Sequence, residues 1–148
     1  MVYLRDYIDP GRIAILDGGA KNEILGRLIE LSRSDELVQD FEKFRKEVLQ
    51  RESIVSTGIG MGVAIPHVKT KSVRSFFITV GVFRKGVDWD SLDGKPVHIA
   101  FLIGGPENHQ EYLQILAKLT LIIRNEQKRR AIVEASSPEQ VLEQFAGL

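Results

Sequence analysis

The sequence lacks cysteine, carries no excess of charge of either sign, and has three scattered histidines. Without cysteine, the chain cannot form disulfides, use a thiolate nucleophile or bind a metal through thiolates. Twenty basic and twenty acidic residues cancel, whereas proteins that bind nucleic acid or anionic membranes normally carry a basic excess. The histidines lack the spacing of a metal site. We therefore expect no nucleic-acid partner, no metal and no cofactor.

Long apolar runs are also absent, and the longest apolar clusters cover only residues 76–83 and 99–103. Neither cluster approaches the length of a membrane span. The first ten residues contain charged side chains and no apolar core of a secretory signal. These features predict a cytoplasmic protein. The length of 148 residues and the apolar fraction of 43% fit one domain over 1–148 with a real core.

Hydrophobic spacing predicts helices before and after a central group of strands. Ser34 and Ser137 are expected to be helix N-caps, and Pro138 to be the first residue of the last helix. This order favours a three-layer α/β sandwich with a mixed sheet flanked by helices. The expected strands are 12–16, 63–65, 75–83 and 97–103, and the expected helices are 20–32, 34–51, 110–124, 126–135 and 138–145.

The most informative segment is STGIGMGVAIPH, residues 56–67, which predicts a glycine-rich loop, a short strand and a rigidly presented imidazole. Glycine permits close approach of another backbone or an anion, and Pro66 fixes its own φ and biases Ile65 towards an extended conformation. A lone histidine at a strand end is usually structural. The segment is neither a dinucleotide fingerprint nor a Walker loop, because no helix follows it and the Walker lysine is missing.

Arg51-Glu52 followed by STGIGxGVAIPHxK closely resembles the phosphorylation-site signature of EIIA components of the phosphoenolpyruvate-dependent sugar phosphotransferase system. The match is to the fructose/mannitol class, which includes the nitrogen-regulatory EIIA proteins. The resemblance extends more weakly over nearly the whole chain. It implies a single EIIA type-2 domain over 1–148, with a mixed sheet of about five strands between helices.

The resemblance implies a phosphocarrier, in which His67 accepts a phosphoryl group from phosphorylated HPr on the ring nitrogen far from the backbone. The group would then pass to an EIIB component for sugar uptake, so that the chain is peripheral to a membrane permease at most. The alternative is a nitrogen-regulatory type of protein that binds target proteins according to its phosphorylation state. A hydrolase with His67 as base is disfavoured, since no serine or carboxylate is an obvious partner.

A phosphoryl-accepting histidine needs one unprotonated nitrogen, a partner that fixes the other nitrogen, and groups that offset the charge on the transferring phosphoryl. Arg51 matches the active-site arginine of the family and is the candidate phosphate clamp, although it also suits the C-terminus of a helix. Thr57, Gly58 and Gly60 are candidates for hydroxyl or backbone contacts with the phosphate. The Thr57 hydroxyl has an alternative use, which is to cap its own backbone.

The sequence departs from the family pattern at the second active-site histidine, because the aligned residue is Tyr112 and His109 lies three residues earlier. Either the Tyr112 hydroxyl supplies the polar contact, or His109 reaches in from the start of the helix. Tyr112 is also compatible with simple packing. His98, within the strand pattern, is expected to be structural.

Residues near His67 offer two further features. Three basic residues within 69–74 are usually a solvated face, but next to His67 they also provide positive potential towards an anionic donor. Met61, Val63 and Val68 flank the site and are candidates for an apolar docking patch, with Val63 better suited to the core.

Overall fold

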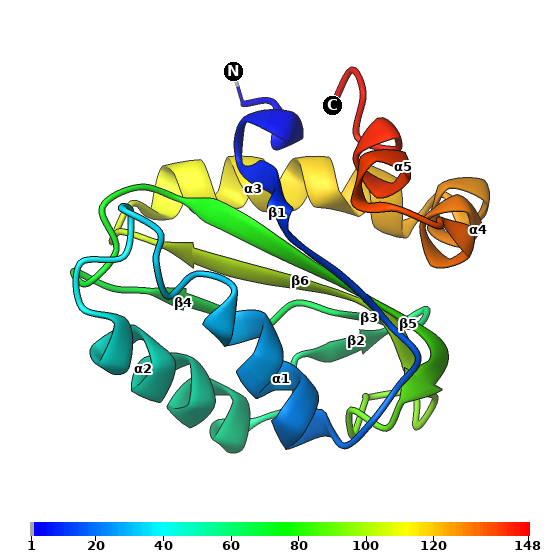
Figure 1. Cartoon of the computed structure of the whole chain (residues 1–148), viewed down its shortest axis with the longest axis horizontal. Coiled ribbons are helices and arrows are strands. Elements are labelled where there is room, and N and C mark those ends of the chain that lie inside the picture. Colours follow the sequence, from blue (N-terminus) through cyan, green and yellow to red (C-terminus); the bar gives the residue numbers. More distant parts are fainter. Residues whose placement is uncertain (1) are drawn as a thin grey trace.

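The computed structural model describes residues 2–148, which form a six-stranded mixed sheet between two layers of helices (Figure 1). Helices α1 and α2 cover one face of the sheet, and α3, α4 and α5 cover the other. The three-layer α/β architecture predicted from the sequence is confirmed. The elements in chain order are η1 (Leu4–Asp6), β1 (Ile8–Leu16), α1 (Lys21–Glu30), α2 (Phe41–Ile54), β2 (Gly58–Gly60), β3 (Val63–Ala64), β4 (His67–Lys69), β5 (Phe77–Val87), β6 (Val97–Gly105), α3 (His109–Ile123), α4 (Glu126–Glu134) and α5 (Pro138–Glu143).

The sheet is built around β5 and β6, which pair antiparallel. On the outer side of β5, strand β1 runs parallel to it. On the outer side of β6, the short strands β3 and β4 pair with it one after the other, both parallel, with Val63 opposite Ile99 and His67 opposite Ile103. Strand β2 pairs antiparallel with β3. We expected His67 to follow the end of a strand, but it is itself the first residue of a strand of the sheet. Strand β2 forms from part of the segment that we expected to be a glycine-rich loop.

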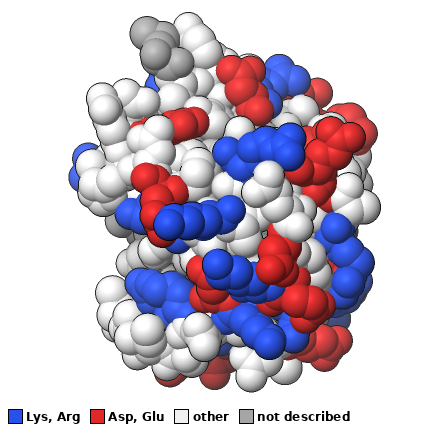
Figure 2. Space-filling model, turned by 90° about the vertical axis from the view of Figure 1, so that its left-hand side faces the viewer, with Lys and Arg blue, Asp and Glu red and all other residues white. Residues whose placement is uncertain are grey.

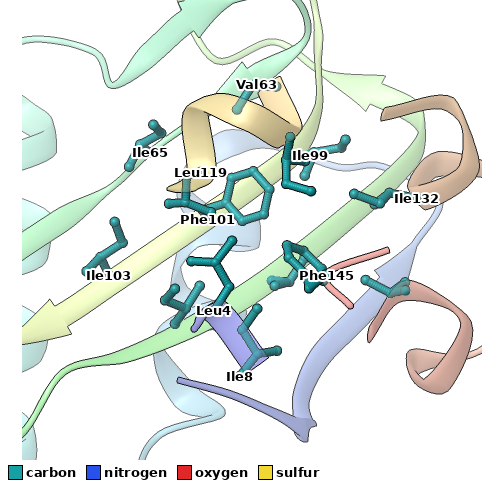
Figure 3. Packing of buried hydrophobic residues seen from close by; sticks show 14 of the residues in the cluster. Leu4, Ile8, Val63, Ile65, Ile99, Phe101, Ile103, Leu119, Ile132 and Phe145 are labelled. Atoms are coloured by element: carbon teal, nitrogen blue, oxygen red, sulfur yellow. The ribbon is translucent and has the colours of Figure 1, made fainter. Parts of the chain in front are cut away.

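Both faces of the central strands are buried, and this explains why β5 and β6 appear as almost continuous apolar runs in the sequence. Alternate residues point to opposite faces: Ile78 and Phe101 pack beneath α3, α4 and α5, whereas Phe77 and Leu102 pack against α1 and α2. Figure 3 shows the first of these clusters. In it, side chains from the sheet meet the N-terminal segment and the three C-terminal helices, through Leu4, Ile8, Val63, Ile65, Ile99, Phe101, Ile103, Leu119, Ile132 and Phe145.

The expected start of the second helix at Ser34 is wrong. Helix α2 begins at Phe41, and its N-cap is Asp40, whose carboxylate accepts from the backbone N–H of Lys43 at 3.1 Å. The segment before it has other backbone partners, since Arg74 N donates to the carbonyl of Leu37 and Gln39 N donates to that of Ser72. These long-range bonds keep residues 35–39 out of a helix. Ser137, by contrast, is the N-cap of α5, as predicted.

The two ends of the chain meet, because Leu4 N donates to the carbonyl of Leu148 at 2.6 Å. Over residues 2–148, none of the helices is both long and apolar enough to cross a membrane. On the face drawn in Figure 2, basic and acidic side chains are interspersed rather than separated into patches of one sign.

Candidate functional site

His67 is the first residue of β4, and its ring is fixed by the backbone just before it. Its Nδ1 lies 2.8 Å from the carbonyl oxygen of Ile65. A carbonyl can only accept, so Nδ1 carries the proton and Nε2 keeps a free electron pair. Pro66 separates the two residues, and its carbonyl accepts from the backbone N–H of Ile103, which anchors the turn to β6. The imidazole is thus held in one tautomer by the local backbone.

The ring of His67 faces a cleft of about 230 Å³ between the end of α2, the start of β2 and helix α3. The cleft is mainly apolar, and its wall includes the guanidinium of Arg51 and the rings of His67 and Tyr112. It is lined by Arg51, Ser56, Thr57, Ile59, Ile65, His67, Tyr112 and Leu116. Three of the predicted site residues, Arg51, Thr57 and Tyr112, therefore line the same cleft as His67.

Arg51 lies in the last turn of α2, and its Nη1 donates to the carbonyl of Val55 at 3.1 Å. Burial lowers the pKa of His67 below its ordinary value of 6.5, and the charges of Arg51 and Lys69 lower it further. The hydrogen bond to Ile65 and the carboxylate of Glu52 act in the opposite direction. At neutral pH the imidazole is consequently uncharged and its Nε2 is available as a nucleophile.

Tyr112 lies against His67, with 5.5 Å between the ring centroids, and it stacks on Phe76 at 6.4 Å. Its side chain is buried, and burial raises the pKa of its phenol, opposed by the nearby charge of Arg51. The phenol therefore stays protonated at neutral pH and can donate a hydrogen bond. His109 is exposed, and its ring centroid lies 6.2 Å from that of Tyr112.

The glycine segment beside the cleft is held by hydrogen bonds within the chain, and Thr57 is the member of the expected phosphate cradle that lines the cleft. The backbone N–H and the hydroxyl of Thr57 both donate to Glu52, at 2.8 and 2.5 Å. Gly58 N donates to the Ser56 hydroxyl, and neither Gly58 nor Gly60 is among the residues that line the cleft. At Gly58, a Cβ would lie 2.3 Å from a Ser91 side-chain oxygen. Close packing against Ser91 therefore accounts for this glycine.

Residues 60–62 make the tight turn between β2 and β3, because all three have positive φ: 99° at Gly60, 58° at Met61 and 74° at Gly62. Glycine adopts such angles without the steric cost that other residues carry. Met61 adopts one as well, and its side chain is exposed at the tip of the turn.

A buried polar network under the cleft was missed in the sequence. The Glu52 carboxylate holds Thr57 and also pairs with the ammonium of Lys21, at 3.0 Å. Trp89 closes the network, because its indole N–H donates to the Thr57 hydroxyl at 3.4 Å. The available signal was helix spacing: Glu52 lies four residues after the buried Val48, on the same face of α2. A carboxylate on a buried helix face needs partners.

The remaining histidine, His98, lies in β6, and its Nδ1 is 2.9 Å from the carbonyl of Phe83. It has the same tautomer-fixing contact as His67, but it lines a different groove, with Met61 and Gly62. In residues 2–148, no three His, Asp or Glu side chains converge as ligands for a metal ion.

Residues 6–147 match the family described as "Phosphoenolpyruvate-dependent sugar phosphotransferase system, EIIA 2". The chain belongs to this EIIA family. The membership confirms the resemblance seen in the signature around His67, and it extends that resemblance to almost the full chain.

Relatives of this EIIA chain include both transport and regulatory proteins. It is 33% identical over 129 residues to a fructose-specific EIIABC component of Bacillus subtilis, covering 86% of this chain and 20% of that protein. It is 34% identical over 135 residues to a nitrogen regulatory protein of Bradyrhizobium diazoefficiens, covering 87% and 88%. The chain thus spans about a fifth of the Bacillus protein and most of the Bradyrhizobium one.

The solved structures similar to this chain also include a nitrogen regulatory protein and a sugar-specific IIA protein. The nitrogen regulatory protein IIA-Ntr of Neisseria meningitidis superposes with a TM-score of 0.86 at 28% identity, covering 95% of this chain and 97% of the other. The Escherichia coli mannitol IIA, solved in complex with phosphorylated mannitol IIB, has a TM-score of 0.80 at 21% identity, covering 93% and 96%. At that identity the mannitol protein shares the fold.

Four exposed apolar side chains that differ from the predicted patch lie on or next to the elements that form the EIIA cleft, and Ile59 among them lines it. Ile54, Val55 and Ile59 lie at the end of α2 and on β2, and Leu113 follows Tyr112 on α3; Ile54 is 78% exposed. Single exposed apolar residues are ordinary, but several on the elements that form one cleft are typical of a contact surface. We call these four residues the apolar rim.

The patch expected from the sequence does not form. Val63 is fully buried, Val68 packs against the core below α1 and α2, and Met61 lines the groove that contains His98.

Proposed function

We propose that this EIIA chain is a phosphocarrier, in which Nε2 of His67 accepts a phosphoryl group from the phosphohistidine of an HPr-like protein and passes it to an EIIB component. The observation that carries the proposal is the fixed neutral imidazole: Nδ1 is bound to the Ile65 carbonyl, and Nε2 is left free beside Arg51. Family membership supplies the reaction class.

In the transfer step, the bond between phosphorus and the donor imidazole breaks, and its electron pair returns to the donor nitrogen. The electron pair on Nε2 of His67 forms the new bond to phosphorus. Each ring keeps the proton on its other nitrogen, so the positive charge of the phosphorylated ring passes from the donor to His67. The carbonyl of Ile65 stabilises that charge, because a hydrogen bond from a cationic ring is stronger than one from a neutral ring.

Arg51 offsets the negative charge on the phosphoryl oxygens. A guanidinium has five N–H donors, and the bond to Val55 uses one of them. The others suit the oxygens of a phosphoryl group, which a planar fork contacts in pairs. In a cleft with mainly apolar walls, a fixed cation stabilises the spread charge of the transition state more than it would in water.

The apolar rim is the proposed docking surface for the donor and for the acceptor of the phosphoryl group. A carrier must bind two partners in turn and release both, which favours a small contact area around an accessible nucleophile. The mannitol IIA neighbour, solved with phosphorylated IIB, supports an EIIB-type partner for this fold.

A regulatory role is the second candidate, in which the phosphorylation state of His67 controls binding to a target protein and no sugar is involved. The observation in its favour is the similarity to nitrogen regulatory proteins, including the Neisseria structure with its TM-score of 0.86. The acceptor chemistry is the same in both candidates, and only the second partner differs.

The test is transfer from labelled phosphoenolpyruvate through enzyme I and HPr. We expect His67→Ala to lose all acid-labile, alkali-stable label while retaining its fold by circular dichroism. His98→Ala is the matched control, because that ring makes the same Nδ1 contact outside the cleft; it should label normally. Undiminished label on His67→Ala would refute the assignment. Arg51→Ala should slow labelling by about one to three orders of magnitude, the usual cost of removing one electrostatic stabiliser.

The two candidates are separated by a second mixing step, in which the labelled protein meets purified EIIB of the fructose or the mannitol system. Transfer of label to EIIB supports the transport role. Retention of label by the chain, with EIIB shown to accept it from its own EIIA, supports the regulatory role.

A further inference from the structure

Lys69 lies beside His67 because of strand geometry. The two residues are two apart in β4, so their side chains leave the same side of the pleat. The Lys69 ammonium lies 4.7 Å from the ring centroid of Tyr112, the same ring that contacts His67. It also lies 2.8 Å from Nδ1 of His109, at the start of α3. Two strand residues and two helix residues thus form one continuous cluster.

We propose that Lys69 supplies the second positive charge to a phosphoryl group on His67, and that Tyr112 and His109 are positioning residues that hold its ammonium at the cleft. The inference rests on the proposed function of His67. In this proposal Lys69, on the strand, takes the role that the family pattern gives to a second histidine at the start of the helix.

Hydrogen-bond chemistry defines the part played by His109. An ammonium has three N–H donors and no acceptor, so Nδ1 of His109 must accept. One N–H is then used, and two remain for phosphoryl oxygens. The face of the Tyr112 ring attracts the cation and fixes its distance from the helix. The ammonium is therefore oriented before any phosphate arrives.

The charges around His67 favour an anion in this place. The charged and titratable groups that surround the ring are Arg51 and Glu52 from α2, Lys69 from β4, and Tyr112 and His109 from α3. The Glu52 carboxylate is bound to Thr57 and Lys21, and its effect on the pKa of His67 opposes that of the two cations.

Arg51 lines the cleft, and the Lys69 ammonium lies on the ring of Tyr112 in its wall. Within residues 2–148, neither cation is paired with an acidic side chain. Lys69 also lies at the positive end of the α3 dipole, where a cation is unfavourable and an anion is favourable. A phosphoryl group on His67 would supply negative charge to the two cations, and it would offset the unfavourable position of the Lys69 charge at the N-terminus of α3.

The variants that test this are Lys69→Gln, Lys69→Arg and His109→Asn, with Lys118→Gln as the matched control. Lys118 is also a partly buried lysine on a tyrosine ring, 5.6 Å from the centroid of Tyr3, and it lines a different groove, with Val2 and Gln114. Lys69→Gln should slow transfer from HPr by about tenfold, because a partly exposed charge contributes less than an enclosed one. Lys69→Arg keeps the charge and should slow transfer less than Lys69→Gln does. His109→Asn keeps an acceptor but shortens its reach to the ammonium, so it should slow transfer by about two- to threefold.

A second readout does not need phosphate. Removal of the Lys69 charge should raise the pKa of His67, measured by NMR titration of the unphosphorylated protein, whereas Lys118→Gln should leave it unchanged. Equal transfer rates for Lys69→Gln and the control, or an unshifted His67 pKa, would overturn the proposal. If neither wild type nor any variant takes up label, the phosphocarrier function itself fails, and the titration still decides whether Lys69 acts on His67.

Discussion

Replacement of Glu52 by alanine should be the most destabilising single change near the cleft. The side chain of Glu52 is 5% exposed, and its carboxylate accepts from Lys21, at 3.0 Å, and from both donors of Thr57. Its removal leaves an ammonium that is only 20% exposed with the Trp89 carbonyl as acceptor but no counter-charge, and it leaves two buried donors of Thr57 without their acceptor. Removal of one member of a buried ion pair costs about 3–5 kcal/mol. Each orphaned neutral donor adds about 1–3 kcal/mol.

These costs overlap, because the cavity left by the carboxylate can admit water to Lys21 and Thr57. We therefore expect a loss of about 3–5 kcal/mol in the free energy of unfolding, a large fraction of the stability of a typical domain. Urea unfolding followed by circular dichroism measures this loss. Glu52→Gln keeps the shape and one acceptor, and it should cost about 1–3 kcal/mol.

A double-mutant cycle with Lys21→Met identifies the cause. If the orphaned ammonium carries most of the cost, Glu52→Ala with Lys21→Met should lose less than the sum of the single changes, by about 1–3 kcal/mol. A loss below about 1 kcal/mol for Glu52→Ala, in the range of ordinary surface changes, would refute the reasoning. So would strict additivity in the cycle.

Two predictions concern the rings of the cleft. The pKa of His67 is depressed below 6.5, so transfer from HPr should stay constant from pH 8 to about 6.5 and fall only at lower pH; a rate that falls above pH 6.5 would contradict this. On acidification the unfolded chain protonates His67 at a higher pH than the folded chain does, so the free energy of unfolding should fall as the pH drops below about 6.5. Tyr112→Phe keeps the packing on Phe76 and should slow transfer by less than about tenfold, and Tyr112→His should be tolerated; a hundredfold loss in the first variant would show that the hydroxyl is essential.

The long-range part of the fold explains which elements could be predicted. Residues 75–83 and 97–103 have strong local signals; the first range overlaps β5, which begins two residues later at Phe77, and the second lies within β6. Strands β2 and β4 have three residues each and depend on pairing with β3 and β6. A three-residue segment has little preference of its own, and its state is decided by the neighbouring strand. The sequence could therefore predict the sheet but not its full number of strands.

The error at Ser34 has the same origin. Ser34 followed by two acidic residues has the local pattern of an N-cap. Asp40 has an equally good cap side chain, and the structure uses it because the segment between the two residues bonds to residues 72–74. No property of residues 34–40 alone reports that contact. Tertiary pairing decides between two helix starts that are locally equivalent.

Function was more predictable than the detailed geometry, because the signature around His67 is long and local. The role of Thr57 shows the limit. A loop hydroxyl next to glycines is a reasonable candidate for phosphate binding, but its proton is donated to Glu52, five residues earlier. The glycines serve the close packing at Ser91 and the turn between β2 and β3. A motif identifies the residues that matter, while packing determines what each of them does.

Arg51 shows that two interpretations of one residue need not compete. At the end of α2 its guanidinium donates to the Val55 carbonyl, which is the helix-terminal role. The same contact fixes the position of the guanidinium, and the side chain lines the cleft with His67. A free surface arginine would lose conformational entropy on meeting a phosphate, whereas one already held by its helix loses less. The helix-terminal bond therefore prepares Arg51 for the clamp that we propose, and Arg51→Lys, with a single charged head and no planar fork, should serve neither role as well.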